Sequence, residues 1–196
     1  MRAVAVTGLV LLALGAGCGS QHSVRPLSDA RLAKLVLQPS DLPGLEQFAN
    51  GREVSSEQSP VLGADPARVG RQRGWVARYR RRGNPDTAGP LLMASTVEMF
   101  DRPARASKFF GQLRKRDATI VAASGLVSVD LPTVGGESYA YATPHARRRT
   151  VRTVIVTWRE GRFVAVAFAN GFAERMSVPD VLALARRQED RLAAAS

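Results

Sequence analysis

The chain has 196 residues, of which 45% are hydrophobic and 23% are charged, and its formal net charge is +11. This composition excludes a disordered protein, and the length allows one domain with a single substantial core. The single cysteine excludes an intramolecular disulfide. No apolar run reaches the roughly 20 residues of a spanning helix, which excludes a polytopic membrane protein.

The N-terminus carries an arginine, then an apolar run that ends in small residues and Cys18. This layout is typical of an export signal with a processing site. The stretch Leu-Gly-Ala-Gly-Cys at residues 14–18 resembles the lipobox of bacterial lipoproteins, with Gly15 where leucine is most common. The resemblance implies that residues 1–17 are a signal peptide and that Cys18 is lipidated. The protein would then be held at the outer face of the cell membrane, because two or more acyl chains give stable retention.

Two other interpretations of this stretch stay open. It also fits an ordinary secretory signal with an incidental cysteine, and an uncleaved anchor. Residues 18–26 are short, polar and rich in small residues, which predicts a tether to a single domain at residues 27–196. An extracytoplasmic location makes nucleic acid an unsuitable partner.

The first part of this domain predicts a short helix followed by strands. Ser28 is a favourable N-cap for the opening helix. A strand is expected near residues 48–54, and a loop at residues 59–66. Apolar and polar side chains alternate at residues 74–82 and again at residues 91–100, which predicts two antiparallel neighbours joined by a short loop.

An amphipathic helix is predicted at residues 101–116, with Asp101 as its N-cap. The favoured interpretation is a domain helix that covers the sheet, because strands flank it closely. The alternative is a basic helix that lies on a membrane surface. The apolar positions of this helix are Ala106, Phe109, Phe110 and Leu113.

The second part of the domain predicts more strands and a closing helix. Strands are expected at residues 120–131 and 137–143, and a hairpin with a Glu-Gly turn at residues 154–169. The closing helix is predicted at residues 178–194, after a capping box that Ser177 opens. About five to seven strands and about three helices predict an α+β fold, with one antiparallel sheet and the helices packed against it.

Residues that carry common catalytic or metal chemistry are scarce. The two histidines, His22 and His145, fall in the tether and in a basic loop. A serine nucleophile elbow, a zinc spacing and a calcium loop are all missing. The glycine-rich stretch at residues 134–137 lacks the lysine and the Ser/Thr of a phosphate loop. The sequence therefore predicts a protein that is not an enzyme, with no catalytic residue, no metal and no cofactor.

Two groups of arginines are candidates for contacts with an anionic ligand or surface. Both groups adjoin strand ends and are expected on one rim of the sheet, where guanidinium groups can pair with phosphate or carboxylate. Attraction to anionic lipid or to an acidic wall polymer agrees with the positive charge. The favoured alternative is that the positive charge reflects arginine-rich codon usage and that the two groups lie in solvated loops. The candidates are Arg78, Arg80, Arg81, Arg82, Arg147, Arg148, Arg149 and Arg152.

Several short motifs follow one another along the domain. They are Leu-Val-Leu at 35–37, Asp-Leu-Pro at 41–43, Val-Gly-Gly-Glu at 134–137, Arg-Glu-Gly-Arg at 159–162 and Leu-Ala-Leu-Ala-Arg at 182–186. In this order they resemble small secreted actinobacterial lipoproteins and the extracellular sensor domains of kinases. The sensor domains are generally held by disulfides, which this chain cannot form. The resemblance implies an α+β extracytoplasmic domain without known catalysis.

These observations together predict a non-enzymatic lipoprotein that binds a small ligand, a lipid or an envelope component. The alternative is an accessory or structural partner of another envelope protein. A deep pocket lined by aromatic side chains would favour ligand binding, and a flat exposed apolar patch would favour a protein partner.

Overall fold

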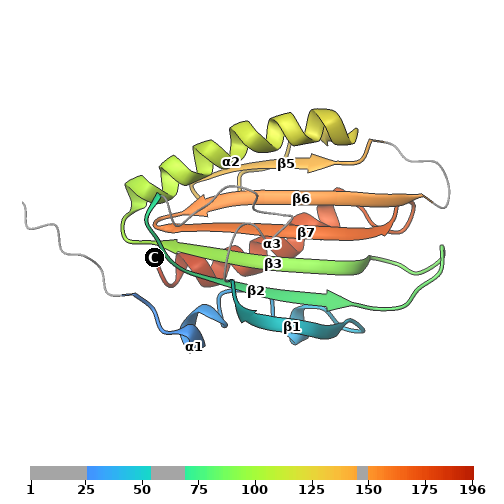
Figure 1. The fold of residues 1–196 in the computed structure, drawn as a ribbon. Helices are drawn as coiled ribbons and strands as arrows, with labels where there is room; N and C mark the ends of the chain where they lie inside the picture. Colours follow the sequence, from blue (N-terminus) through green and yellow to red (C-terminus); the bar gives the residue numbers. More distant parts are fainter. Residues whose placement is uncertain (1–25, 54–68, 145–149) are drawn as a thin grey trace, which may run out of the picture.

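The described residues form one seven-stranded sheet in which all neighbouring strands are antiparallel (Figure 1). The computed structural model describes residues 26–53, 69–144 and 150–196. The strand order is β1-β2-β3-β7-β6-β5-β4. The strands are β1 (Glu46–Arg52), β2 (Arg71–Arg80), β3 (Pro90–Phe100), β4 (Val127–Ser128), β5 (Glu137–Ala142), β6 (Val151–Glu160) and β7 (Phe163–Phe172).

Helices lie on both faces of this sheet. Within the described part of the chain these are α1 (Asp29–Leu32), α2 (Pro103–Ser124) and α3 (Val178–Ala193), with one 3₁₀ turn at Pro39–Asp41. Figure 1 shows α3 behind the sheet and α2 on the opposite side, along β5. The predicted α+β class, with one antiparallel sheet and about three helices, is confirmed.

The larger core lies between the sheet and α3. Alternate residues of the central strands point to this face, because successive side chains of a strand point to opposite sides. Trp158 of β6 and Phe163 of β7 are fully buried there, and Leu32 of α1 closes the same core. The capping box of α3 is present: Asp180 N–H donates to the Ser177 hydroxyl, and Ser177 N–H donates to the Asp180 carboxylate.

A chain of buried hydrogen bonds fixes α3 and the N-terminal segment to β3. The backbone N–H of Leu37 donates to the Ser95 hydroxyl at 2.9 Å. That hydroxyl donates to the side-chain oxygen of Gln188 at 2.7 Å. The amide nitrogen of Gln188 donates to the carbonyl of Thr96 at 2.9 Å. The Leu37 N–H, the Ser95 hydroxyl and the Gln188 amide therefore all have hydrogen-bond partners, as buried polar groups generally do.

The helix α2 is longer than the sequence predicted. It continues to Ser124, so the predicted strand at residues 120–131 is wrong over its first half, and only Val127–Ser128 is a strand. The buried face of the helix continues from Leu113 to Val121 at helical spacing, and the half-buried Asp117 lies between them on this face. Gly125 ends the helix in the left-handed conformation, with a φ of 68°.

The start of α2 also differs from the prediction by one residue. Arg102 is its N-cap and makes no capping hydrogen bond. The predicted cap, Asp101, instead forms ion pairs with Arg102 at 3.5 Å and Arg105 at 3.4 Å.

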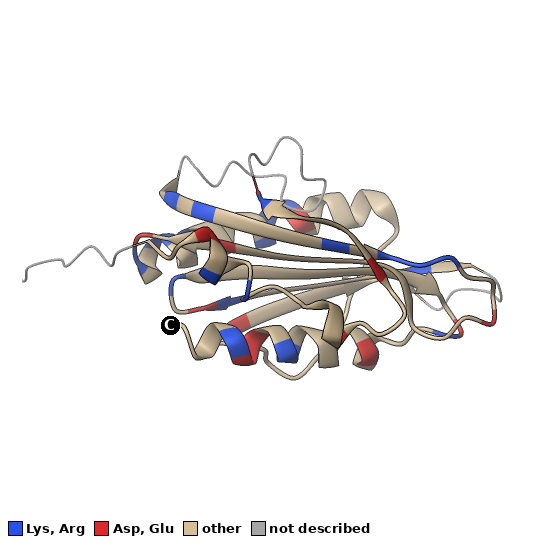
Figure 2. Cartoon of the chain, turned by 90° about the horizontal axis from the view of Figure 1, so that it is seen from below, with Lys and Arg blue, Asp and Glu red and all other residues tan. Residues whose placement is uncertain are grey.

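The smaller core lies between α2 and the sheet. Its buried side chains include Phe109, Phe110 and Leu113 of the helix, which pack on Tyr139 of β5 and Val164 of β7. Figure 1 shows that α2 lies on the β5 side of the sheet, away from β1 and β2. No helix of the described residues covers this face over β1 and β2 (Figures 1 and 2).

Candidate functional site

Strand pairing aligns one residue from each of five strands in a row across the face that α2 covers only in part. Arg78 of β2 pairs with Ala94 of β3, and Ala94 pairs with Phe168 of β7. Phe168 pairs with Ile155 of β6, and Ile155 pairs with Tyr141 of β5. Because neighbouring strands lie about 4.8 Å apart, the row is about 19 Å long. We call these residues the floor row.

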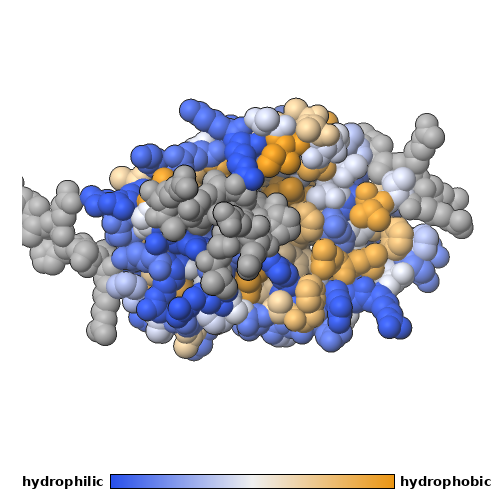
Figure 3. All heavy atoms as spheres, in the orientation of Figure 1, coloured by the Kyte–Doolittle hydropathy of each residue, from blue (hydrophilic) through white to orange (hydrophobic). Residues whose placement is uncertain are grey.

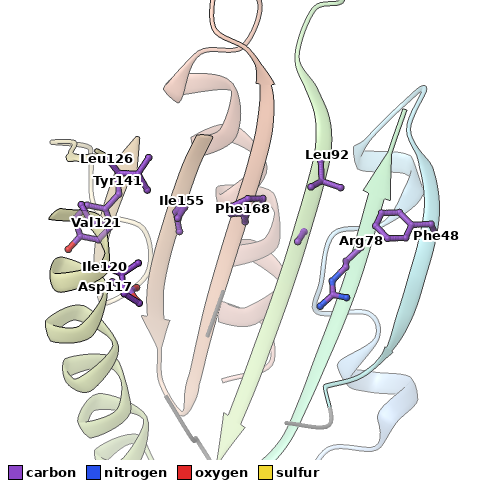
Figure 4. Close-up of a pocket in the computed structure, with 11 residues that line it drawn as sticks. Phe48, Arg78, Leu92, Asp117, Ile120, Val121, Leu126, Tyr141, Ile155 and Phe168 are labelled. Carbon is purple, nitrogen blue, oxygen red and sulfur yellow. The ribbon is translucent and has the colours of Figure 1, made fainter. Parts of the chain in front are cut away.

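A cavity of about 410 Å³ lies on the floor row. Figure 4 shows its walls: Asp117, Ile120 and Val121 of α2 stand on one side, and Phe48 of β1 stands on the other. Leu126 and Leu92 complete the lining. The space-filling view in Figure 3 shows apolar side chains grouped on this face, with hydrophilic ones beside them. The volume and the apolar lining suit a small organic ligand.

A β-bulge places Phe48 at the cavity. Gln47 pairs with Tyr79 and Ala49 pairs with Arg78, so Phe48 is the extra residue between them. A bulge bends the strand and redirects a side chain. Phe48 is 42% exposed, and the guanidinium of Arg80 lies over its ring, 5.1 Å from the centroid. The bulge thus adds an exposed aromatic wall to the cavity.

The side of the cavity formed by α2 contains an acidic residue, Asp117. The hydroxyl of Tyr139 donates to the Asp117 carboxylate at 2.7 Å. Burial raises the pKa of Asp117, while the hydrogen bond from Tyr139 and the charge of Arg116 lower it in part. Burial and the nearby Asp117 both raise the pKa of Tyr139, which therefore stays a hydrogen-bond donor. This side of the cavity favours donor groups over anions.

The opposite side of the cavity is basic. Arg78 extends from the floor row, and next to it lies the buried Glu53, whose pKa burial raises and the charges of Arg78 and Arg71 lower. Arg71 donates to both carboxylate oxygens of Glu98, at 3.1 and 3.0 Å. Burial nevertheless raises the pKa of Glu98 to about 8. Burial therefore favours the protonated form of both acids that lie beside these two guanidinium groups.

The structure separates the arginines that the sequence grouped as candidate contacts. Of those in the described residues, only Arg78 lines the cavity. The side chain of Arg81 binds the carbonyls of Ala88 and Pro90, the latter at 2.9 Å, and so closes a loop. Arg152 donates to the carbonyl of Met176 at 3.2 Å. A separate polar hollow at the end of β2 is lined by Glu46, Arg80, Arg81 and Arg82.

Several predicted residues lie outside the described part of the chain, so their placement stays a prediction. They are Cys18, His22, His145, Arg147, Arg148 and Arg149. The strand end at Arg80 and the strand start at Arg152 do lie on one rim, because β2 and β6 run in opposite directions.

No ligand-binding role was predicted from the sequence for most of the residues that line the cavity. Leu92 and Ala94 of β3, like Ile155 and Phe168, alternate with residues that face α3. This alternation was the available signal, since apolar side chains on both faces of a strand indicate that both faces are covered or occupied. The aromatic side chains at the cavity are Phe48, Tyr141 and Phe168, while ligand binding itself stays a prediction.

Among the described residues, no three acidic, histidine or cysteine side chains come together in a way that could hold a metal ion. Across the same ranges, no helix has the length and apolar character needed to cross a membrane.

Comparison with known proteins identifies a similar fold. No family model matches the chain, and no curated protein matches it. The structure is similar to the crystal structure of the extracellular domain of PknH from Mycobacterium tuberculosis, with a TM-score of 0.61 and 11% sequence identity. The match covers 86% of this chain and 97% of the PknH domain. At this identity the similarity shows that the two chains share their fold.

Proposed function

We propose that this protein is a non-enzymatic, extracytoplasmic lipoprotein domain that binds a small apolar ligand in the cavity on the floor row. The observation that carries the proposal is the cavity of about 410 Å³, lined mainly by apolar side chains, on a sheet face that α2 covers only in part. The shared fold with an extracellular kinase domain supports the extracytoplasmic location.

The exposed apolar residues also favour a ligand over a protein partner. In the described ranges, the exposed large hydrophobic side chains are Phe48, Ile120, Val127 and Val151. Two of these, Phe48 and Ile120, line the cavity. Val127 lies on the edge strand β4 and Val151 at the start of β6. Half of these exposed apolar side chains therefore border the cavity, and the other two lie apart on different strands.

We expect the neutral fluorescent probe N-phenyl-1-naphthylamine to bind to the chain from Gly19 to Ser196, which contains every element of the fold described above. Ala94→Phe should weaken this binding by about tenfold or more, because the new ring projects from the floor row into the cavity. The measurement is a fluorescence titration, and circular dichroism verifies that the variant is folded.

Ala104→Phe is the matched control, because it adds the same ring at an exposed position of α2 outside the cavity. This variant should bind the probe like the unmodified chain. If the unmodified chain does not bind the probe, or if Ala94→Phe binds it equally well, the cavity is not a ligand site.

Anchoring through Cys18 is proposed from the signal sequence. We expect the intact mass of the protein from a membrane fraction to equal that of the chain from Cys18 onward plus its acyl groups. Cys18→Ser should move the protein from the membrane fraction to the soluble fraction. A membrane-bound chain with an unmodified Cys18 would contradict the proposed anchor.

A further inference from the structure

We propose that the ligand of this cavity is a single-chain amphiphile whose one anionic group, a carboxylate or a phosphate monoester, is bound by Arg78 while its alkyl chain lies along the floor row. The inference rests on the proposed function, because it specifies the class of ligand for the same cavity.

The position of Arg78 is the first argument. It is the one cationic side chain among the residues that line the cavity, and it stands at the β2 end of a row that is otherwise apolar up to Tyr141. Its neighbour on β3 is Ala94, whose side chain is short, and Figure 4 shows the Arg78 side chain among the residues that line the cavity. A guanidinium offers several N–H donors in a planar fork that fits a carboxylate or a phosphate.

The partners of Arg78 give the second argument. Within the described ranges, no hydrogen bond or ion pair joins the side chain of Arg78 to another residue. The carboxyl group of Glu53 interacts electrostatically with Arg78, and it interacts in the same way with Arg71. The cluster of Arg71, Arg78, Glu53 and Glu98 therefore keeps an excess of positive charge near neutral pH, since burial favours the protonated form of Glu98. A ligand anion would balance this charge.

The far side of the cavity fixes the direction of the ligand. Asp117 lies there and already accepts a hydrogen bond from Tyr139. Arg78 is the one cationic side chain of the lining, so the anionic group belongs there, and the apolar chain points toward Ile120 and Val121 of α2.

The shape of the floor favours a single alkyl chain. The floor row runs across five strands for about 19 Å, and Phe168 and Ile155 form its apolar centre. Phe48 and Ile120 stand at its two borders. The cavity of about 410 Å³ is at the small end of the range for organic ligands, which suits one chain rather than two.

The test compares three ligands with the same alkyl chain: dodecanoate, dodecyl phosphate and dodecanol, each below its aggregation concentration. Their affinities are measured by displacement of N-phenyl-1-naphthylamine from the chain that begins at Gly19. We expect at least one of the two anions to bind about tenfold or more tightly than dodecanol, because a hydrogen bond to a charged group contributes more than one to a neutral group. The tighter anion identifies the headgroup.

Arg78→Met should remove this preference and leave the affinity for dodecanol unchanged. Arg82→Met is the matched control: it removes the same charge at an exposed position outside the cavity, and it should keep the preference. Arg78→Lys, which keeps the charge but loses the planar fork, should keep part of it.

The outcomes separate the two proposals. If the probe and dodecanol bind but the anions bind no better, the anionic headgroup is wrong and the ligand cavity stands. If Arg82→Met lowers the anion preference as much as Arg78→Met, general charge attraction explains it, and the assignment to Arg78 is wrong. If neither the probe nor any of the three ligands binds, both proposals are wrong. The comparison of anions with dodecanol on the unmodified chain decides the question even if Arg78→Met does not fold.

Discussion

Arg71→Met is expected to lower the free energy of unfolding by roughly 3 kcal/mol near pH 9, and by clearly less near pH 5, because it removes one partner of a buried ion pair. Arg71 donates to both oxygens of Glu98, whose side chain has no exposed area. The Glu98 carboxylate lies against Gly74, and a Cβ at residue 74 would come within 2.4 Å of it. A larger residue at position 74 therefore cannot provide a new partner for Glu98.

The pH dependence follows from the pKa of Glu98. Burial raises this pKa from 4.5 to about 8, so between these values the folded chain keeps a proton that the unfolded chain loses. The stability that this proton contributes is full below about pH 4.5 and is lost as the pH rises through about 8. The charged carboxylate needs Arg71 most at the upper end of this range.

Urea denaturation at the two pH values measures the effect. Arg80→Met is the control, because the Arg80–Glu46 pair is exposed and 4.0 Å apart, and such pairs contribute less than about 1 kcal/mol. Glu98→Gln should flatten the dependence of stability on pH between about 4.5 and 8. Equal losses for Arg71→Met at both pH values would show that Arg71 acts through packing instead of charge.

Ser95→Ala is the second change with a large expected effect, a loss of roughly 2–4 kcal/mol in the free energy of unfolding. The Ser95 hydroxyl accepts from the N–H of Leu37 and donates to Gln188. Its removal leaves both buried groups without a partner, and each such group costs about 1–3 kcal/mol. Thermal and urea unfolding measure the loss.

A double-mutant cycle separates the hydrogen bonds from the packing. Gln188→Leu in the Ser95→Ala background removes the unpaired oxygen, so the second change should cost less there than in the unmodified chain. Ser124→Ala is the control, because its hydroxyl is exposed at the end of α2. Strictly additive losses at Ser95 and Gln188 would contradict the proposed coupling.

The elements in which apolar residues recur with a helical or strand period could be predicted from the sequence. The helical spacing at residues 178–194 gave the buried face of α3, including Gln188, and the alternation at residues 74–82 gave the two faces of β2. These patterns are local, so they do not depend on which elements meet in the fold.

The end of α2 was mispredicted because the local signals conflict. Ile120 and Val121 are β-branched and favour a strand, whereas the contact of Val121 with the smaller core favours the helix. The packing of Val121 therefore favours continuation of the helix to Ser124, and Gly125 ends it.

The candidate site depends on information that no single segment of the sequence contains. The floor row exists because β3 lies beside β7, two strands that are far apart in the chain. Its alignment also depends on the pairing register of four strand pairs. The bulge at Phe48 is a further irregularity of pairing that residue type does not reveal.

The floor row has a consequence for how such a domain can diverge. Each of its residues comes from a different strand, and in β2, β3 and β7 the neighbours in sequence, such as Ala77, Met93 and Ala167, point into the core under α3. A substitution at a floor position thus changes the shape or polarity of the cavity and leaves the packing of that core intact. Ligand selectivity in this architecture can therefore evolve through single, independent replacements, while the stability of the scaffold is maintained by the opposite face of the same strands.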